Sequence, residues 1–131
     1  MMAKRKILLV DDEVDFVELM KMRFEASGYE VITANNGKEA LDKFKNDKPA
    51  ALLLDIMMPE MDGLAVLKQI RAEDATVPVF IVTAFSNEDR IKAAGKLNAT
   101  GFIIKTQDLG KEIKNVTQAI DIAEKFKEKR G

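Results

Sequence analysis

The sequence Ile7-Leu8-Leu9-Val10-Asp11-Asp12-Glu13 places four consecutive apolar residues directly before three acidic ones. A short, unbroken apolar run is typical of a strand that is covered by helices on both faces. Runs of the same kind follow at Ala51–Leu54, Val79–Val82 and Phe102–Ile104. Tyr29–Ala34 is more polar, as expected of a strand at the edge of a sheet. The chain thus carries five candidate strands.

Helical periodicity fills the intervals between these runs. The first helix is marked by Phe16, Val17, Met20 and Phe24 and is expected to end at Gly28. Further helices are marked by Ala40, Leu41 and Phe44, by Leu64, Leu67 and Ile70, by the segment Ser86–Leu97, and by Leu109, Ile113, Val116 and Ile120. Strands and helices alternate, and right-handed crossovers then predict an α/β fold with a doubly wound parallel sheet and helices on both faces.

The composition, with 131 residues of which 47% are hydrophobic and 33% charged, is that of one globular domain spanning residues 1–131. The chain has neither Cys nor His, which excludes disulfides, thiolate or imidazole metal ligands and a phosphohistidine of its own. Lys and Arg number 21 against 22 Asp and Glu, so the basic excess of a nucleic-acid binder is missing. Apolar runs such as Ala50–Leu54 are far shorter than a membrane span, and Ile7–Val10 is too short for a signal-peptide core. We therefore expect a soluble cytoplasmic protein that binds neither membrane nor nucleic acid.

Polar side chains stand where the predicted strands end. Ligands of open α/β sheets bind outside the carboxyl ends of the strands, and the residues found there are Asp11, Asp12, Glu13, Asp55, Thr83 and Lys105. Each of them alone is also explained as a turn former, a solvated charge or a helix cap. In that reading Asp12 or Glu13 caps the first helix, and Thr83 or Ser86 caps the fourth.

As a group, these residues indicate a phosphoryl-transfer site. Two carboxylates about 5 Å apart repel each other by roughly 3 kcal/mol, so a cluster of Asp11, Asp12 and Asp55 calls for a cation. Mg²⁺ prefers oxygen ligands of this kind. An Asp carboxylate can itself take up a phosphoryl group, and a hydroxyl and an ammonium can hold the phosphoryl oxygens.

These residues give the chain a resemblance to the receiver domains of response regulators, of the stand-alone chemotaxis-regulator type. The resemblance covers about Lys4 to Lys127, and the pieces that carry it are Ile7–Glu13, Leu54–Gly63, Val82–Ala84 and Gly101–Lys105. It implies a flavodoxin-like sheet with the strand order 2-1-3-4-5. It also implies a phosphorylation switch of a two-component system, which takes part in its own phosphorylation and dephosphorylation and is not an enzyme.

The resemblance further implies roles at the metal site. Asp55 would accept a phosphoryl group from a partner histidine kinase or phosphotransfer protein. Asp12 and Asp55 would bind Mg²⁺ directly, Asp11 would bind it through water, and the Met57 carbonyl would complete the protein ligands.

The two switch residues implied by the resemblance are Thr83 and Phe102. Thr83 and Lys105 would bind phosphoryl oxygens, and Phe102 would fill the space that Thr83 leaves. The surface of the fourth helix, fifth strand and fifth helix would then shift toward a downstream protein target. The apolar Met57 and Phe85, each two positions past a site residue, predict a long-lived phosphorylated state.

The sequence departs from the family at two positions. Thr106 stands where relatives usually have Pro after the Lys. A cis bond at Lys105–Thr106 would cost roughly 3–4 kcal/mol, which favours trans, and Thr106 or Asp108 is then a candidate cap of the fifth helix. Asn98 stands where relatives often have Gly, and Asn also tolerates a left-handed helix end.

Other functions fit the same residues less well. A phosphatase with an Asp nucleophile would carry an Asp-x-Asp pattern at the first strand, and two residues beyond Asp55 stands Met57, which cannot act as an acid. A flavin- or nucleotide-binding protein needs a Gly- or Ser/Thr-rich loop where Asp11 and Asp12 stand. A degenerate receiver would lack part of the acid, hydroxyl and lysine set. The chain is either a stand-alone regulator or a receiver excised from a longer kinase or transcription regulator.

Overall fold

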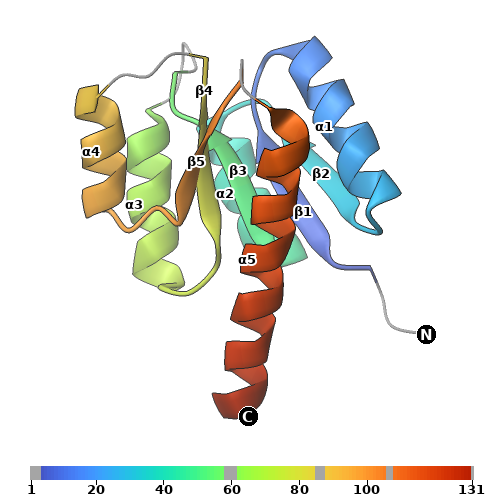
Figure 1. Ribbon diagram of the computed structural model, residues 1–131. Helices are drawn as coiled ribbons and strands as arrows, with labels where there is room; N and C mark the ends of the chain where they lie inside the picture. Colours follow the sequence, from blue (N-terminus) through green and yellow to red (C-terminus); the bar gives the residue numbers. More distant parts are fainter. Residues whose placement is uncertain (1–3, 58–61, 85–87, 106–107, 131) are drawn as a thin grey trace.

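The structure is a computed structural model that describes residues 4–57, 62–84, 88–105 and 108–130. Within these residues, strands and helices alternate along the chain (Figure 1) in the order β1 (Lys6–Val10), α1 (Val14–Ala26), β2 (Glu30–Ala34), α2 (Gly37–Asp47), β3 (Ala51–Asp55), α3 (Gly63–Glu73), β4 (Val79–Thr83), α4 (Glu88–Lys96), β5 (Gly101–Ile104) and α5 (Leu109–Arg130).

The five strands form one parallel sheet in the order β2-β1-β3-β4-β5, as expected. Helices α1 and α5 cover one face, and α2, α3 and α4 cover the other (Figure 1). Each face has its own apolar core, since alternate residues of a strand point to opposite sides. Leu8 and Leu52 belong to the core beneath α2, α3 and α4, whereas Ile7 and Leu53 belong to the core beneath α1 and α5.

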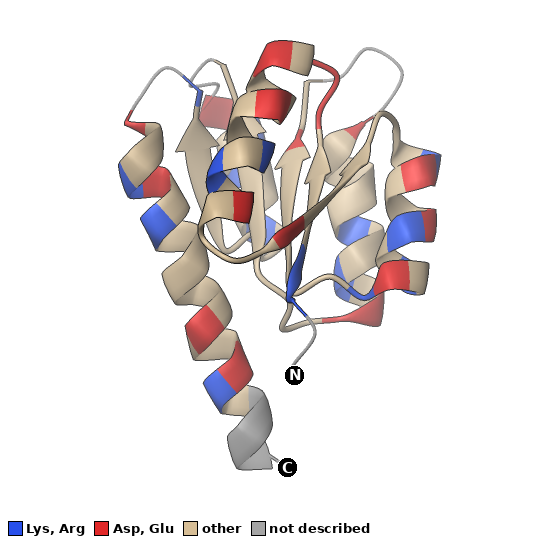
Figure 2. Ribbon diagram, turned by 90° about the vertical axis from the view of Figure 1, so that its right-hand side faces the viewer, with Lys and Arg blue, Asp and Glu red and all other residues tan. Residues whose placement is uncertain are grey.

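The burial of the strands follows their place in the sheet. All residues of β3 and β4 are buried, and β1 is buried from Ile7 onward. Strand β2 is less buried, with one exposed and two half-buried residues, and it lies at the edge of the sheet as expected. Figure 2 shows the same division, with charged residues concentrated on the helices and at strand ends, while the strands are largely uncharged.

Helix ends follow the capping residues in the sequence. The Asn36 and Asp62 side chains accept backbone N–H groups at the starts of α2 and α3. Asp108 accepts the N–H of Lys111 at 3.3 Å and caps α5, and Thr106, the other candidate, lies outside the described residues. Helix α4 ends at Lys96, and Asn98 in the turn after it has a φ of 67°, the left-handed conformation expected there.

The first helix is capped differently from either sequence prediction. Glu13 occupies the N-cap position of α1, but its side chain makes no capping hydrogen bond. The nearby Asp11 instead accepts the N–H of Glu13 at 2.9 Å. Ser86, a candidate cap of α4, lies outside the described residues. The side chain of Glu13 is thus free for another contact, which lies in the site.

Helix α5 continues well beyond the sheet, to Arg130 (Figure 1). Ile113, Val116 and Ile120 are buried against the sheet, as their spacing predicts, whereas Ile122 and Phe126 beyond them are exposed. In the part of the chain that the structure describes, no helix is both long and apolar enough to cross a membrane.

Candidate functional site

The predicted site residues meet at the carboxyl edge of the sheet. Asp11 directly follows β1, Asp55 and Thr83 are the last residues of β3 and β4, and Lys105 directly follows β5. The backbone N–H of Lys105 donates to the Thr83 carbonyl at 2.9 Å. Asp55 pairs in register with Val82, the residue before Thr83. Residues far apart in the sequence therefore lie side by side because parallel strands end at one edge.

Three carboxylates form the acidic part of the site. One oxygen from each of Asp11, Asp12 and Asp55 lies within 4.8 Å of the others. Asp11 and Asp55 are only 1% and 5% exposed, whereas Asp12 faces solvent. Oδ2 of Asp11 is buried, and its charge partner among the site residues is the Nζ of Lys105, 2.9 Å away. Two buried acids and one exposed acid, each offering an oxygen within 4.8 Å of the others, form a donor set that fits a hard cation such as Mg²⁺.

Backbone amides hold two of these carboxylates in place. Asp11 Oδ1 accepts the N–H of Glu13 at 2.9 Å, and Asp55 Oδ1 accepts the N–H of Met57 at 2.8 Å. Each Asp thus closes a turn with the residue two positions later. The second oxygen of each carboxylate remains directed to the site. The predicted capping or turn-forming role of these residues and their proposed site role therefore coexist.

The ammonium group of Lys105 lies among the carboxylates. Its Nζ is 2.9 Å from Asp11 Oδ2, 2.9 Å from Glu13 Oε1 and 3.6 Å from Asp55 Oδ2. It also lies 4.8 Å from the centre of the Phe16 ring, within cation–π range. The side chain of Lys105 is only 10% exposed. The contacts of Glu13 and Phe16 with Lys105 were not predicted from the sequence, where Glu13 reads as a helix cap and Phe16 as a core residue.

Burial and charge shift the acid–base properties of the site. Burial raises the pKa of Asp55 above its ordinary value, and the charge of Asp11 adds to this rise, against the hydrogen bond from Met57 and the charge of Lys105. Burial also disfavours the charged form of Lys105, but the carboxylates of Asp11 and Glu13 outweigh it and raise the pKa of Lys105. The site therefore holds a firmly protonated lysine beside a carboxylate whose charge is destabilised.

The proposed switch residues lie on adjacent strands. Thr83 is 2% exposed. Phe102 is half-buried and packs against the core beneath α2, α3 and α4, the core to which Ala94 of α4 also belongs. Met57 is 53% exposed beside the acidic cluster. Phe85 and Thr106 lie outside the described residues, and so does the peptide bond between Lys105 and Thr106.

Gly63 allows α3 to begin against the strand that carries Asp55. A Cβ atom at Gly63 would lie 2.6 Å from Cα of Ile56 and 2.8 Å from the carbonyl oxygen of Asp55. Such distances are far inside van der Waals contact, and both partners are backbone atoms that cannot turn away. Any larger residue at this position would displace the segment that holds Asp55.

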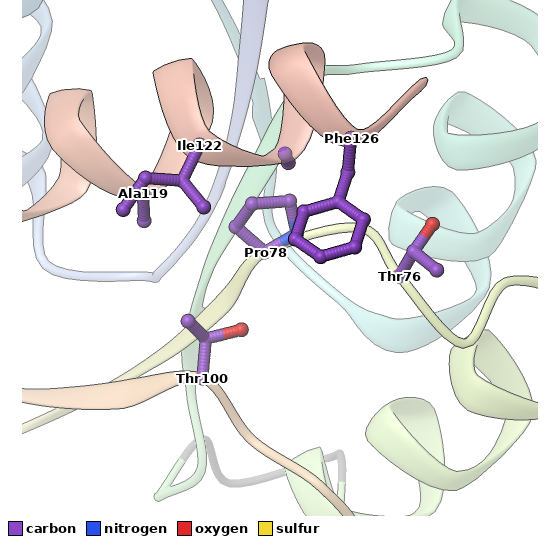
Figure 3. A pocket seen from close by; sticks show the side chains of 7 residues that line it. Thr76, Pro78, Thr100, Ala119, Ile122 and Phe126 are labelled. Carbon is purple, nitrogen blue, oxygen red and sulfur yellow. The ribbon is translucent and has the colours of Figure 1, made fainter. Parts of the chain in front are cut away.

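A separate groove of about 450 Å³ lies away from the acidic cluster, at the opposite end of β4 and β5 (Figure 3). Ile122 and Phe126 of α5 face Pro78 and Thr100 across it. The groove is largely apolar and contains none of the predicted site residues.

An acidic cluster, a hydroxyl and a buried lysine at the carboxyl edge of a 2-1-3-4-5 sheet define the class of phosphoacceptor signalling switches. The family model of the response regulator receiver domain matches residues 7–118. The chain belongs to this family, as the sequence motifs indicated, and its members serve as switches of two-component systems.

Similar proteins support this assignment. The chain is 37% identical to the alkaline phosphatase synthesis transcriptional regulatory protein PhoP of Bacillus subtilis, over 91% of this chain and 51% of that protein. It is 35% identical to the regulatory protein AtoC of Escherichia coli, over 99% of this chain and 28% of that protein. A CheY-like receiver domain protein from Methanospirillum hungatei superimposes with a TM-score of 0.87 at 25% identity, covering 94% of this chain and 98% of its own. The chain thus spans about half the length of PhoP and less of AtoC.

Proposed function

We propose that Asp55 accepts a phosphoryl group from the phosphohistidine of a partner histidine kinase or phosphotransfer protein. A carboxylate oxygen of Asp55 attacks phosphorus, the phosphorus–nitrogen bond breaks, and the imidazole of the partner leaves with the bonding electron pair and takes up a proton. An acyl phosphate remains on Asp55. The observation that carries this proposal is the buried Nζ of Lys105, which lies 3.6 Å from Asp55 Oδ2.

The chain's own residues prepare this step. The N–H of Met57 fixes Asp55 Oδ1 and thereby orients the carboxylate. Lys105 neutralises charge as it builds up on the phosphoryl oxygens. Asp11, Asp12, Asp55 and the Met57 carbonyl are the groups that would hold Mg²⁺, which when bound supplies positive charge that lets carboxylate and phosphoryl group approach.

The output surface in this proposal comprises α4, β5 and α5. The hydroxyl of Thr83 turns to the phosphoryl group, and Phe102 moves into the space that it leaves, which biases a two-state equilibrium. Phe102 suits this role because it packs against the core that also holds Ala94 of α4. A downstream protein would recognise the shifted surface.

The test is incubation with acetyl phosphate and Mg²⁺, followed by intact mass before and after. We expect one added phosphoryl group in the wild type, none in Asp55→Asn or without Mg²⁺, and normal labelling in the matched control Asp42→Asn, which alters an exposed acid on α2. A labelled Asp55→Asn protein would refute the assignment of the acceptor. Sustained turnover of a phosphate ester would instead indicate the phosphatase alternative, because we propose a phosphoacceptor and not an enzyme.

A further inference from the structure

Arg71 of α3 joins three segments that are distant from the acidic cluster. Its Nε donates to the carbonyl of Asn98 at 2.9 Å, and its Nη1 donates to the carbonyls of Asp74 at 3.1 Å and Val77 at 2.7 Å. Its Nη2 lies 3.5 Å from Oγ1 of Thr100. The planar guanidinium has donors on several sides, so it can hold the end of α3, the start of β4 and the turn after α4 together.

The turn after α4 is itself a well-formed helix end. Asn98, in the left-handed conformation, donates its N–H to Gly95 at 3.0 Å, and Ala99 donates its N–H to Ala94 at 3.0 Å. These two hydrogen bonds form a Schellman motif, which satisfies the last carbonyls of a helix. Arg71 binds the carbonyl of the central residue, Asn98, and so attaches the helix end to the body of the protein.

Through Thr100, the contacts of Arg71 are connected to the sheet. Oγ1 of Thr100 accepts the N–H of Val79 at 3.0 Å, while the Thr100 N–H donates to the Val79 carbonyl at 2.8 Å. The starts of β4 and β5 are therefore linked through backbone and side chain at the point that Arg71 contacts. A displacement of the α4 end would have to break several of these hydrogen bonds together.

Most of α4 lies at the surface of the protein. Among the described residues of α4, only Ala94 is buried. Near its N-terminal end, Arg90 lies 3.8 Å from Asp62, and the two side chains are 37% and 59% exposed. Helix α4 begins at Glu88, five residues after Thr83, so its N-terminal end is the end nearer to the proposed switch residue, whereas Arg71 binds the turn at its other end.

We propose that Arg71 is a positioning residue of the switch, which fixes the C-terminal end of α4 so that the helix responds to phosphorylation by moving at its N-terminal end. This inference rests on the proposed function for the movement itself. The anchoring by Arg71 belongs to the resting protein as well and can be measured there. Lys cannot replace Arg in this role, because its single ammonium does not reach three carbonyls from one fixed plane.

The experiment compares the wild type with Arg71→Lys and with Arg5→Lys, a matched control whose guanidinium makes an exposed ion pair with Asp121. Amide hydrogen exchange is first measured without ligand. In Arg71→Lys, we expect exchange at Leu97 and Ala99 to become about tenfold faster, as for the loss of one or two net hydrogen bonds. Amides of α1 and α2 that exchange through local openings should remain unchanged, and the control should resemble the wild type throughout.

Backbone chemical shifts are then recorded with beryllium fluoride and Mg²⁺, which mimic the phosphoryl group. In the wild type, changes should reach Thr83 and the first turns of α4 and stop before Asn98–Thr100. In Arg71→Lys they should continue through Asn98–Thr100.

The outcomes separate the two proposals. Unchanged exchange at Leu97 and Ala99 in Arg71→Lys would overturn the anchoring role. An equal acceleration at the locally opening amides of α1 and α2 would also overturn it, because Arg71 would then act on the whole protein without positioning α4. Wild-type shift changes confined to the loops around Asp11 and Asp55 would contradict the proposed output surface, while the exchange measurement would still decide whether Arg71 anchors α4.

Discussion

Removing the charge of Asp55 should stabilise the metal-free protein. Asp55 is 5% exposed, and one of its oxygens lies within 4.8 Å of an Asp11 oxygen. At an effective dielectric constant of 20, the repulsion between these two charges is about 3 kcal/mol, and the attraction to Lys105 at 3.6 Å is about 4 to 5 kcal/mol. These terms largely cancel, so the desolvation of the Asp55 carboxylate remains, which amounts to several kcal/mol for a buried ion.

The Asp55→Asn variant keeps the shape of the side chain. Its amide oxygen can still accept the N–H of Met57, and its amide N–H group can donate to Oδ2 of Asp11, which also pairs with Lys105. The variant loses the ion pair with Lys105, which retains Asp11 and Glu13 as partners. We therefore expect the free energy of unfolding to rise by about 1–3 kcal/mol at neutral pH without Mg²⁺.

The sign of the pH dependence follows from the raised pKa of Asp55. The Asp55 carboxyl binds a proton more tightly in the folded protein than in the unfolded chain. Protonation of Asp55 therefore favours folding at pH values below the pKa that Asp55 has in the unfolded chain. That contribution is lost as the pH rises through the folded pKa. The advantage of Asp55→Asn should therefore be largest at neutral pH and should shrink as the pH falls toward the ordinary pKa of 3.8.

The assay is urea unfolding followed by far-UV circular dichroism, at several pH values, with and without Mg²⁺. The matched control Asp42→Asn, on the exposed surface of α2, should change stability by no more than about 0.5 kcal/mol. A metal-free Asp55→Asn protein that is equally or less stable than the wild type at neutral pH would refute the reasoning. A stability difference that does not depend on pH would also refute it.

Three further predictions concern the same site. Mg²⁺ should raise the unfolding midpoint of the wild type and have far less effect on Asp12→Asn, and equal shifts in a thermal melt would remove Asp12 from the ligands. Gly63→Ala should cost about 2 kcal/mol or more in urea unfolding because its Cβ would meet backbone, whereas Gly95→Ala, which meets nothing within 4 Å, should be neutral or stabilising. Met57→Asn combined with Phe85→Glu should shorten the life of the acyl phosphate, followed as loss of phosphoryl mass, and an unchanged decay rate would contradict the role assigned to these apolar residues.

The positions of the strands and of the acidic site were predictable because both depend on local patterns. The buried runs Ile7–Val10 and Ala51–Leu54 contain almost nothing but β-branched and aliphatic residues, and burial on both faces imposes that composition. Asp11, Asp55 and Lys105 could be brought together in advance because parallel strands end at a common edge. Asn98 and Gly28 were recognisable as helix ends because few other residues adopt a positive φ.

Other features depend on contacts between distant segments and were not predicted. Glu13 was a candidate cap of α1, but its carboxylate binds Lys105, a residue 92 positions away. Lys48 ends α2 with a φ of 47°, although its residue type does not indicate a left-handed conformation. Nothing in the sequence pattern singles out Arg71, yet its guanidinium binds carbonyls up to 27 residues away. Backbone carbonyls exist at every residue and leave no mark in a sequence, so only the packing of α3 against the turn after α4 decides which of them a side chain can reach.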